Sequence, residues 1–313
     1  TEPEKTFEEV LDEHPVSIQV NGQWQTFPNA RAAEEAAYGE YKDNLRRTAE
    51  NFRITDDHLG EGGPKAKFQA NIAAIKLLKY LEETTEQATP EQQKILSRYV
   101  GWGGLADAFD PEKPAWAAEY TQLKELLTPE EYTAARGSTL NAHYTSPTVI
   151  RAIYETVGRM GFETGNILEP SMGVGNFFGM LPEEMRNSRL YGVELDPISG
   201  RIAKQLYPKA DITVGGFETT DRRDFFDLAI GNVPFGQYQV NDKAYNKLNF
   251  NIHNYFFAKA LDQVRPGGVV AFVTSRYTMD AKDSTVRRYL AQRAELLGAI
   301  RLPNDAFKKN AGA

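Results

Sequence analysis

The chain has 313 residues, of which 41% are hydrophobic, and this length is too great for one small core and indicates two or three units. It contains no run of about 18 apolar residues and begins without the apolar core of a signal peptide, so we expect a soluble, cytoplasmic protein without a membrane span. The absence of cysteine and the four dispersed histidines exclude a disulfide framework and a thiolate zinc site, and the net charge of −7 excludes a protein that coats nucleic acid over its whole surface.

The first 62 residues are predicted to form a small ribbon and a helix. Residues 16–27 alternate apolar and polar side chains around Asn21-Gly22, a dipeptide typical of tight hairpin turns. Residues 30–52 are rich in Ala and Glu and indicate a surface helix. We treat 1–62 as a hairpin and helix segment that is either an ordered brace or a linker.

Residues 63–136 are predicted to form a helical domain. The run 65–83 places Phe68, Ile72 and Ile75 at helical spacing. Two Thr-Pro-Glu sequences, at 89–91 and 128–130, each combine an N-cap with a proline in the first helical turn. The glycine-rich turn at 101–104 is interpreted as a helix end with a packed tryptophan rather than as a ligand contact.

From residue 137 onward we expect an α/β domain that extends to residue 313. Short β-rich runs alternate with helical ones, which is typical of a doubly wound, mostly parallel sheet with helices on both faces. The expected strands are 166–168, 190–193, 211–214, 228–231, 269–274 and 297–301.

Residues 167–177 run from a buried strand into a turn that contains Gly173 and Gly175 and then into a helix. Glycines at such a turn let a ligand approach the backbone, but dinucleotide-binding turns share this feature. The acidic Glu169 at the strand end distinguishes the segment, because a carboxylate there favours a cationic ligand. A methylsulfonium with an amino-acid head suits this turn better than a pyrophosphate does.

Residues 190–196 form the second informative segment, about twenty residues further on. Glu194 follows an apolar strand, and a carboxylate at the end of the second strand accepts both hydrogen bonds of a ribose diol. We therefore expect Glu194 to bind a ribose.

Residues 227–236 form the third segment, an apolar strand that ends in Asn232-Val233-Pro234-Phe235. An exocyclic amine conjugated with its ring is a poor nucleophile, and two acceptors are needed to orient its two hydrogens. The Asn232 side-chain oxygen and the carbonyl of Val233 are expected to supply them. Phe235 is expected to stack on a base that has left its duplex.

The three segments together resemble the class I S-adenosylmethionine-dependent N6-adenine DNA methyltransferases, in the subgroup whose cofactor motifs precede an Asn-Pro-Pro-Phe/Tyr motif. The resemblance covers about residues 137–313 and includes an upstream segment, 143–147, in which Tyr144 or Thr145 would approach the methionine moiety and Ser146-Pro147 would cap a helix. The whole chain is similar to the methylase portion of large methylase-helicase fusion proteins carried by conjugative elements and phages. Restriction-modification proteins share this chemistry.

The resemblance implies a Rossmann-like domain, S-adenosylmethionine as cofactor, and DNA as partner, with a flipped adenine as target. It implies catalytic roles for Asn232, Val233, Pro234 and Phe235. The implied cofactor-binding residues are Tyr144, Thr145, Glu169, Pro170, Ser171, Gly173, Gly175, Asn176, Phe177, Glu194, Leu195 and Phe217. No metal is implied.

The sequence departs from the family pattern at two positions. Val233 stands where the tetrad usually has its first proline, and Gly216 stands where an aspartate often holds the cofactor's adenine amine. Phe217 is expected to stack on that adenine, with Glu218 as a substitute acceptor. The chain also reaches Ala313 before a final hairpin or a target-recognition domain, so we expect a fragment of a longer protein with recognition and helicase domains elsewhere.

Three alternatives to adenine methylation follow from the same residues. The first is methylation of an RNA base or of a protein glutamine, whose planar amide-like nitrogens suit a related tetrad. The second is an inactive module that binds cofactor or DNA inside a helicase-containing protein. The third, a dinucleotide-dependent oxidoreductase, does not explain the tetrad, and the absence of cysteine excludes cytosine C5 methylation, which needs a thiolate nucleophile.

The charge is unevenly distributed along the chain. Residues 1–135 carry 14 basic and 25 acidic side chains, whereas the remainder carries 22 basic and 18 acidic ones. The most basic stretch, 276–309, is compatible with a solvated helix face or with a phosphate-facing surface.

Overall fold

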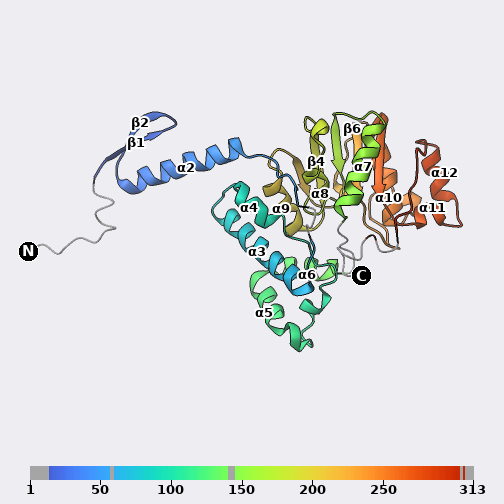
Figure 1. Cartoon of the computed structure of the whole chain (residues 1–313), viewed down its shortest axis with the longest axis horizontal. Helices are drawn as coiled ribbons and strands as arrows, with labels where there is room; N and C mark the ends of the chain where they lie inside the picture. The colour runs from blue at the N-terminus through green and yellow to red at the C-terminus, as the bar shows by residue number, and fades with distance from the viewer. Residues whose placement is uncertain (1–13, 57–59, 140–144, 304–305, 307–313) are drawn as a thin grey trace, which may run out of the picture.

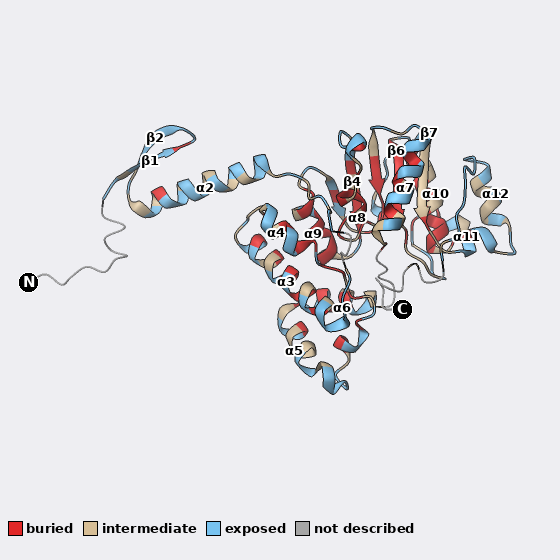
Figure 2. Ribbon diagram, viewed as in Figure 1, coloured by how far each residue is buried: buried red, intermediate tan, exposed pale blue. Residues whose placement is uncertain are grey.

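The computed structural model describes residues 14–56, 60–139, 145–303 and 306 of the chain. A hairpin and a long helix extend from a body in which a cluster of helices lies against an α/β domain (Figure 1). Figure 2 shows that the hairpin and the long helix are mostly exposed, whereas the sheet is mostly buried.

The N-terminal arm consists of the antiparallel strands β1 (Val16–Val20) and β2 (Gln23–Phe27), followed by helix α2 (Ala30–Thr48). Asn21 and Gly22 connect the strands with φ angles of +53° and +75°, as a two-residue hairpin turn requires. The side chain of Asn29 caps α2 by accepting a hydrogen bond from the Ala32 amide at 2.8 Å. The predicted hairpin is confirmed, and the predicted helix ends at Thr48 rather than at residue 52.

Residues 50–54 form an ordered brace between the arm and the α/β domain. The amide of Phe52 donates to the carbonyl of Leu206 at 2.8 Å, and the amide of Ile54 donates to the carbonyl of Gly179 at 2.9 Å. The Glu50 carbonyl accepts from the side chain of Gln93 at 3.1 Å. Of the two roles considered for this part of the chain, the structure supports the brace for these five residues.

The helices that follow are built around a common apolar core. Their bounds are α3 (Pro64–Glu83), α4 (Pro90–Leu96), α5 (Ala117–Leu126) and α6 (Pro129–Ser138), with the short 3-10 helices η1 (Ala106–Phe109) and η2 (Pro114–Trp116). Capping boxes begin α4 at Thr89 and α6 at Thr128, as the Thr-Pro-Glu sequences predicted.

Trp102, in the glycine-rich turn, lies in the middle of this core. It is 1% exposed, and its ring meets Phe109 edge-on at a centroid distance of 5.3 Å and Phe68 at 6.1 Å. The packed tryptophan of this interpretation is therefore confirmed, whereas the helix that was expected to end near Val100 already ends at Leu96.

The α/β domain contains a five-stranded parallel sheet in the order β5-β4-β3-β6-β7. The strands are β3 (Asn166–Glu169), β4 (Arg189–Glu194), β5 (Asp211–Val214), β6 (Phe226–Asn232) and β7 (Val264–Val273). The helices are α7 (Pro147–Arg159), α8 (Asn176–Gly179), α9 (Pro197–Leu206), α10 (Ile252–Gln263), α11 (Tyr277–Asp280) and α12 (Thr285–Ala291), with short 3-10 turns η3 (Glu183–Met185), η4 (Phe217–Thr219) and η5 (Asn246–Leu248). The chain proceeds outward from β3 in one direction and from β6 in the other, so the strand order reverses between these two neighbours.

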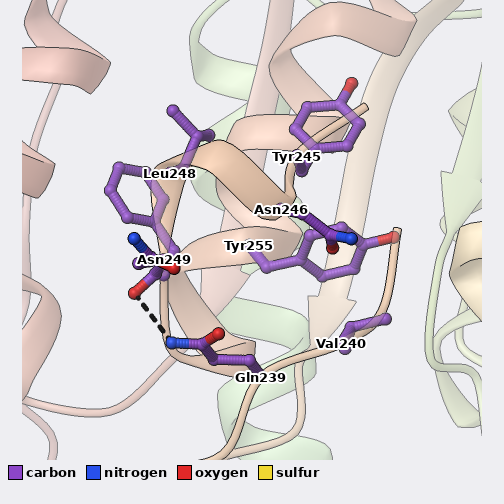
Figure 3. Close-up of a pocket in the computed structure, with 8 residues that line it drawn as sticks. Gln239, Val240, Tyr245, Asn246, Leu248, Asn249 and Tyr255 are labelled. Carbon is purple, nitrogen blue, oxygen red and sulfur yellow. Dashed lines mark hydrogen bonds between the residues drawn. The ribbon is translucent and has the colours of Figure 1, made fainter. Parts of the chain in front are cut away.

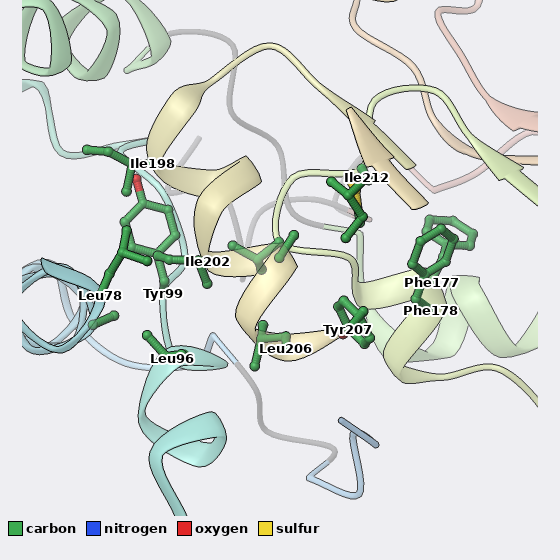
Figure 4. Packing of buried hydrophobic residues seen from close by; sticks show 14 of the residues in the cluster. Leu78, Leu96, Tyr99, Phe177, Phe178, Ile198, Ile202, Leu206, Tyr207 and Ile212 are labelled. Atoms are coloured by element: carbon green, nitrogen blue, oxygen red, sulfur yellow. The ribbon is translucent and has the colours of Figure 1, made fainter. Parts of the chain in front are cut away.

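One apolar cluster joins the helical region to the α/β domain. Leu78 of α3 and Leu96 of α4 belong to the same buried cluster as Ile198, Ile202 and Leu206 of α9 (Figure 4). A second cluster, around Phe217, Tyr255 and Phe256, packs on the other side of the sheet. The helical region and the sheet therefore share buried surface, which stabilises both.

The predicted strand at 297–301 is wrong. The described residues 294–303 have no regular structure, and Leu297 and Ile300 are 62% and 83% exposed. An apolar run forms a strand only when it pairs with a neighbour, and in this structure the segment does not pair with β7.

Candidate active site

The predicted site residues meet at the carboxyl edge of the sheet, where its strand order reverses. Glu169 ends β3, Glu194 ends the neighbouring β4, and Asn232 ends β6 on the opposite side of β3. Ligands of open parallel sheets bind outside the carboxyl ends of the strands at such a reversal. The fold alone therefore brings these three side chains to one ligand-binding edge.

The turn after β3 is held against the end of β4 by backbone hydrogen bonds. The Met172 amide donates to the carbonyl of Val193 at 3.0 Å, and the Gly173 amide donates to the Glu194 carboxylate at 2.7 Å. Gly173 adopts a φ of +56° with open space where a side chain would lie, so its backbone is accessible to a ligand. Gly175, at a φ of +87°, leaves no room for a β-carbon beside the ring of Tyr207.

Glu194 is a buried carboxylate that accepts two backbone hydrogen bonds. The Gly173 and Asp196 amides each donate to it at 2.7 Å. Burial is the main cause that raises the pKa of Glu194 to about 7, and the charge of Asp196 adds to it, although the backbone donors oppose the shift. The carboxylate is thus positioned and half protonated near neutral pH.

Glu169 is 2% exposed and pairs in the β3–β4 register with Gly192, two residues before Glu194. Its Oε2 atom has no hydrogen-bond partner among the described residues, and burial followed by the charge of Glu194 raises the pKa of Glu169 well above its usual value. A β-carbon on Gly231 of β6 would lie 3.3 Å from the Glu169 Cγ atom, which places Glu169 against the strand that carries Asn232. Two buried carboxylates with an unused acceptor fit a ligand that combines positive charge with hydroxyl donors, as S-adenosylmethionine does.

The tetrad Asn232-Val233-Pro234-Phe235 continues directly from β6. Asn232 lies opposite Val273 in the β6–β7 register, and the Val233 amide donates to the Val273 carbonyl at 3.1 Å. Val233 is 2% exposed, whereas Asn232, Pro234 and Phe235 are half-buried. The Val233 side chain is thus a core residue, whereas the other three side chains are partly accessible at the carboxyl edge of the sheet.

The remaining predicted cofactor residues differ in accessibility. Leu195 is 74% exposed at the end of β4, and Ser171 and Asn176 are half-buried. Thr145 is buried beside Ser146, which caps α7 as predicted by accepting from the Val149 amide at 3.4 Å. Pro170 and Phe177 are buried, so Phe177 is available to a ligand only through its backbone. Tyr144 lies outside the described residues.

Gly216, Phe217 and Glu218 follow the end of β5 at the carboxyl edge of the sheet. Phe217 is 3% exposed and packs on Phe256 at a ring centroid distance of 5.0 Å. The Glu218 carboxylate lies over Gly216, where it occupies the position that a β-carbon of residue 216 would take. The departure at Gly216 therefore leaves space that this chain fills with a carboxylate from two residues further on.

A buried ion pair, which local sequence patterns do not predict, joins α10 to the loop between β6 and α10 (residues 233–251, called the tetrad loop). Asp242, in the loop after the tetrad, accepts hydrogen bonds at 2.8 Å from Lys259 and from Tyr255, both on α10. Lys259 is 4% exposed and lies 5.2 Å from the centroid of the Phe217 ring. The only sequence feature that indicates this pair is a lysine within the apolar helix 252–263. Its partner, Asp242, is 17 residues away in the sequence.

A shallow pocket opens in the same loop. Figure 3 shows Tyr245 and Tyr255 beside Gln239 and Asn249, whose side chain and carbonyl are joined by a hydrogen bond of 3.2 Å. This pocket lies in the tetrad loop rather than at the ends of β3 and β4, so it is not the cofactor site.

Comparison with known proteins finds methylases similar to parts of this chain. Residues 207–307 match the family model of the Eco57I restriction-modification methylase. The chain is 28% identical over 258 residues to the defense against restriction protein B of Escherichia phage P1, which covers 80% of this chain and 10% of that protein. It is 42% identical over 83 residues to the type II methyltransferase M.CvrRI of Paramecium bursaria Chlorella virus XZ-6E, which covers 26% of this chain and 21% of that protein. The chain therefore spans about a tenth and about a fifth of these two relatives.

The fold is that of the class I methyltransferases. A solved structure from Listeria monocytogenes, assigned to the class I S-adenosylmethionine-dependent methyltransferases, matches with a TM-score of 0.50 and 16% identity over 79% of this chain and 84% of that one. Residues 207–307 are therefore similar to a restriction-modification methylase, and the chain shares the fold of an S-adenosylmethionine-dependent methyltransferase. Among the described residues, no helix is long and apolar enough to cross a membrane.

Proposed function

We propose that this chain transfers the methyl group of S-adenosylmethionine to the N6 amine of adenine in DNA. The observation that carries the proposal is the position of Asn232 to Phe235 at the reversal of strand order, beside Glu169 and one strand further from Glu194. This arrangement offers a cofactor site and two amine-orienting acceptors on one edge.

In the proposed reaction, the side chains of the β3 and β4 ends hold the cofactor. Glu194 accepts hydrogen bonds from the ribose hydroxyls, and the carboxylate of Glu169 compensates positive charge. Gly173 presents its backbone without a side chain in between. We place Phe217 and Glu218 at the adenine ring of the cofactor, with Glu218 as acceptor for its amine. When bound, the cofactor supplies an electrophilic methyl group on sulfur.

The tetrad orients the nucleophile. The Asn232 side-chain oxygen and the Val233 carbonyl accept the two hydrogens of the adenine amine, which directs the nitrogen lone pair toward the methyl group. One N–C bond forms as the C–S bond breaks, and the amine then loses one proton to water. Because the amine is paired inside a duplex, the adenine must leave the helix, and Phe235 stacks on it in the site.

Methyl transfer from tritiated cofactor to unmethylated DNA tests this proposal. We expect label in N6-methyladenine after digestion of the DNA, and Asn232→Ala should lower the rate by about a hundredfold or more, since one of two orienting acceptors is lost. Asn187→Ala, an exposed asparagine in the turn before β4, is the matched control and should keep the wild-type rate. Label in RNA or in protein glutamine instead of DNA would contradict the choice of substrate.

Two observations favour an inactive binding module as the second candidate. Val233 replaces a proline of the tetrad, and Gly216 lacks the acceptor carboxylate of the family. Calorimetry distinguishes the candidates, because a module would bind the cofactor without transferring label, whereas the enzyme does both.

Recognition of a DNA sequence is proposed to depend on linked domains. The similar phage P1 protein is far longer than the region matched by this chain, which covers 10% of it. We infer that a helicase or recognition domain joined to such a methylase selects the site, and that this chain supplies the methyl transfer.

A further inference from the structure

A basic segment begins three residues after Val273, the residue of β7 that is hydrogen-bonded to the tetrad. The Val273 carbonyl, which accepts from the Val233 amide, ends β7, and the chain continues through Thr274 and Ser275 to Arg276. Because β6 and β7 are parallel neighbours, Arg276 follows the same carboxyl edge as Asn232. The segment 276–301 carries six basic and three acidic side chains.

Helix α12 holds this segment beside the tetrad loop. Its Tyr289 meets Phe250, at the end of that loop, edge-on at a ring centroid distance of 5.2 Å, and Val286 and Tyr289 pack against the second apolar cluster. Arg288 lies on the exposed side of the helix, and Arg293 follows its end. Figure 1 shows α11 and α12 next to α10, which begins where the tetrad loop ends.

Two of the three acidic side chains of the segment, Asp280 and Asp283, interact with neighbours other than these arginines at hydrogen-bond distance, whereas Glu295 is exposed. Asp280 pairs with Arg301 at 2.7 Å, and Asp283 accepts hydrogen bonds from the amide and hydroxyl of Thr285. Among the described residues, Arg276, Arg288 and Arg293 form no ion pair within 4 Å, although Asp280 and Asp283 are near enough to interact electrostatically with Arg276 and Arg288.

Aromatic rings position two of these guanidinium groups. Arg293 lies 3.6 Å from the centroid of the Tyr289 ring, and Arg276 lies 5.0 Å from that of Tyr277. A ring restricts the side chain without neutralising its charge, which lowers the entropy lost when the arginine binds an anion.

We propose that Arg276, Arg288 and Arg293 form a surface that binds the phosphate backbone of DNA on one side of the target adenine. The inference rests on the proposed function, which places that adenine at Asn232. Guanidinium groups bind phosphate oxygens through paired hydrogen bonds, and a strand presents one phosphate about every 3.4 Å. Because the chain has a net charge of −7, its overall charge does not attract DNA. A localised basic surface beside the tetrad supplies an attraction for the DNA phosphates.

The test is the salt dependence of duplex binding by the whole chain, measured by fluorescence anisotropy without methyl transfer. The triple variant R276Q/R288Q/R293Q should weaken binding by roughly tenfold or more at low salt and flatten the slope of log K against log salt by up to about 2.7, since each lost phosphate contact removes about 0.9. Replacing the same residues by lysine should preserve most of the slope.

The matched control is R47Q/R159Q/R186Q, which removes exposed arginines of α2 and α7 and one directly after η3, and should leave the slope unchanged. Cofactor affinity, measured by calorimetry, should be the same in all variants and shows that the fold is intact. An unchanged slope in the first triple variant, or an equal change in the control, would overturn the surface. The proposal would also be overturned if the wild type preferred single-stranded RNA and the first triple variant lost this RNA binding but kept duplex binding unchanged.

The result is independent of the outcome for the proposed function. If the wild-type chain binds duplex DNA through these arginines but transfers no label, the proposed methyl transfer is contradicted and the proposed DNA-binding surface is supported. If the wild type transfers label and the slope is the same in the first triple variant as in the wild type, the proposed surface is contradicted and the proposed methyl transfer is supported.

Discussion

Glu169 and Glu194 are carboxylates at the ends of neighbouring strands, and both are buried. Burial raises the pKa of both carboxyl groups, and the charge of Glu194 raises that of Glu169 further. Such a pair favours a ligand that brings positive charge and hydrogen-bond donors. The cofactor site is therefore expected to take up its ligand with release of a proton.

The pH dependence of cofactor binding follows from the pKa of Glu194, which is about 7. A ribose diol that donates to Glu194 requires the ionised carboxylate, so the contribution of Glu194 to the affinity should rise with pH up to about 7 and level off above it. Below that value, affinity should fall by up to about tenfold per pH unit. Calorimetry in buffers with different ionisation enthalpies measures the proton released.

Glu194→Gln should bind the cofactor more weakly and lose this pH dependence, whereas the exposed Glu184→Gln should behave as wild type. The stability of the ligand-free chain should change in the opposite direction. A raised pKa in the folded state contributes stability that is present below the ordinary glutamate pKa and is lost as the pH rises through 7. Affinity that is constant from pH 6 to 8 in the wild type would contradict the role of Glu194.

At the level of secondary-structure elements, the buried pair of Lys259 and Asp242 fixes the tetrad loop to α10. The pKa of Asp242 is lowered, because hydrogen bonds from Lys259 and Tyr255 outweigh the effect of burial, which acts to raise it. Lys259→Met should therefore cost about 3 to 5 kcal/mol in the free energy of unfolding, since a carboxylate is left buried without its partner. The double variant Lys259→Met, Asp242→Asn should recover much of that loss. Urea denaturation measures both.

Lys94→Met, which breaks an exposed pair with Glu91 on α4, is the control and should cost less than about 1 kcal/mol. If Lys259→Met costs no more than this control, the pair does not stabilise the loop. If Lys259→Met and the double variant lose the same free energy of unfolding, the loss arises from packing rather than from the unpaired charge of Asp242.

Local patterns predicted most of the elements, whereas contacts between distant segments could not be predicted. The alternation around Asn21-Gly22 and the Thr-Pro-Glu caps specify local geometry, and the structure confirms them. The segment 297–301 has the composition of a strand, but pairing depends on a partner that local sequence does not provide.

The candidate site shows the same division. Glu169, Glu194 and Asn232 were predicted because each follows an apolar strand, and a parallel sheet brings its carboxyl ends together. The brace at 50–54 and the contact between Lys259 and Asp242 join segments that are far apart in the sequence, with no periodicity to reveal them. The cofactor and catalytic roles of the predicted residues stay predictions.

At the scale of the whole molecule, a polar network joins the helical region to the α/β domain. Glu131 of α6 forms ion pairs with Lys79 of α3 and with Arg201 of α9, and Arg201 also pairs with Glu82 at 2.9 Å. The same Glu131 side chain completes the capping box of α6 by accepting from the Thr128 amide. Burial acts to raise the pKa of Glu131, but these donors hold it below its usual value. The stability that Glu131 contributes is therefore present above the ordinary glutamate pKa and is lost at lower pH.

This network and the shared apolar cluster predict that the two regions unfold together, although the sequence suggested a boundary near residue 137. All three tryptophans precede that boundary, and two of them, Trp102 and Trp116, lie in the helical region. Tryptophan fluorescence therefore follows the N-terminal parts, whereas loss of cofactor binding follows the α/β domain. Denaturant titration of the wild type should give coincident transitions by both measurements.

Glu131→Gln should shift both transitions to lower denaturant by the same amount, corresponding to about 2 kcal/mol for partly exposed ion pairs and one weakened cap. Glu130→Gln, the exposed neighbour in the same helical turn, is the control and should shift neither by more than a few tenths of that amount. If the fluorescence transition moves in Glu131→Gln while loss of cofactor binding does not, the helical region unfolds independently. The shared cluster would then be an interface between two separate folding units rather than a common core, and the boundary near residue 137 would divide the molecule thermodynamically as well as in sequence.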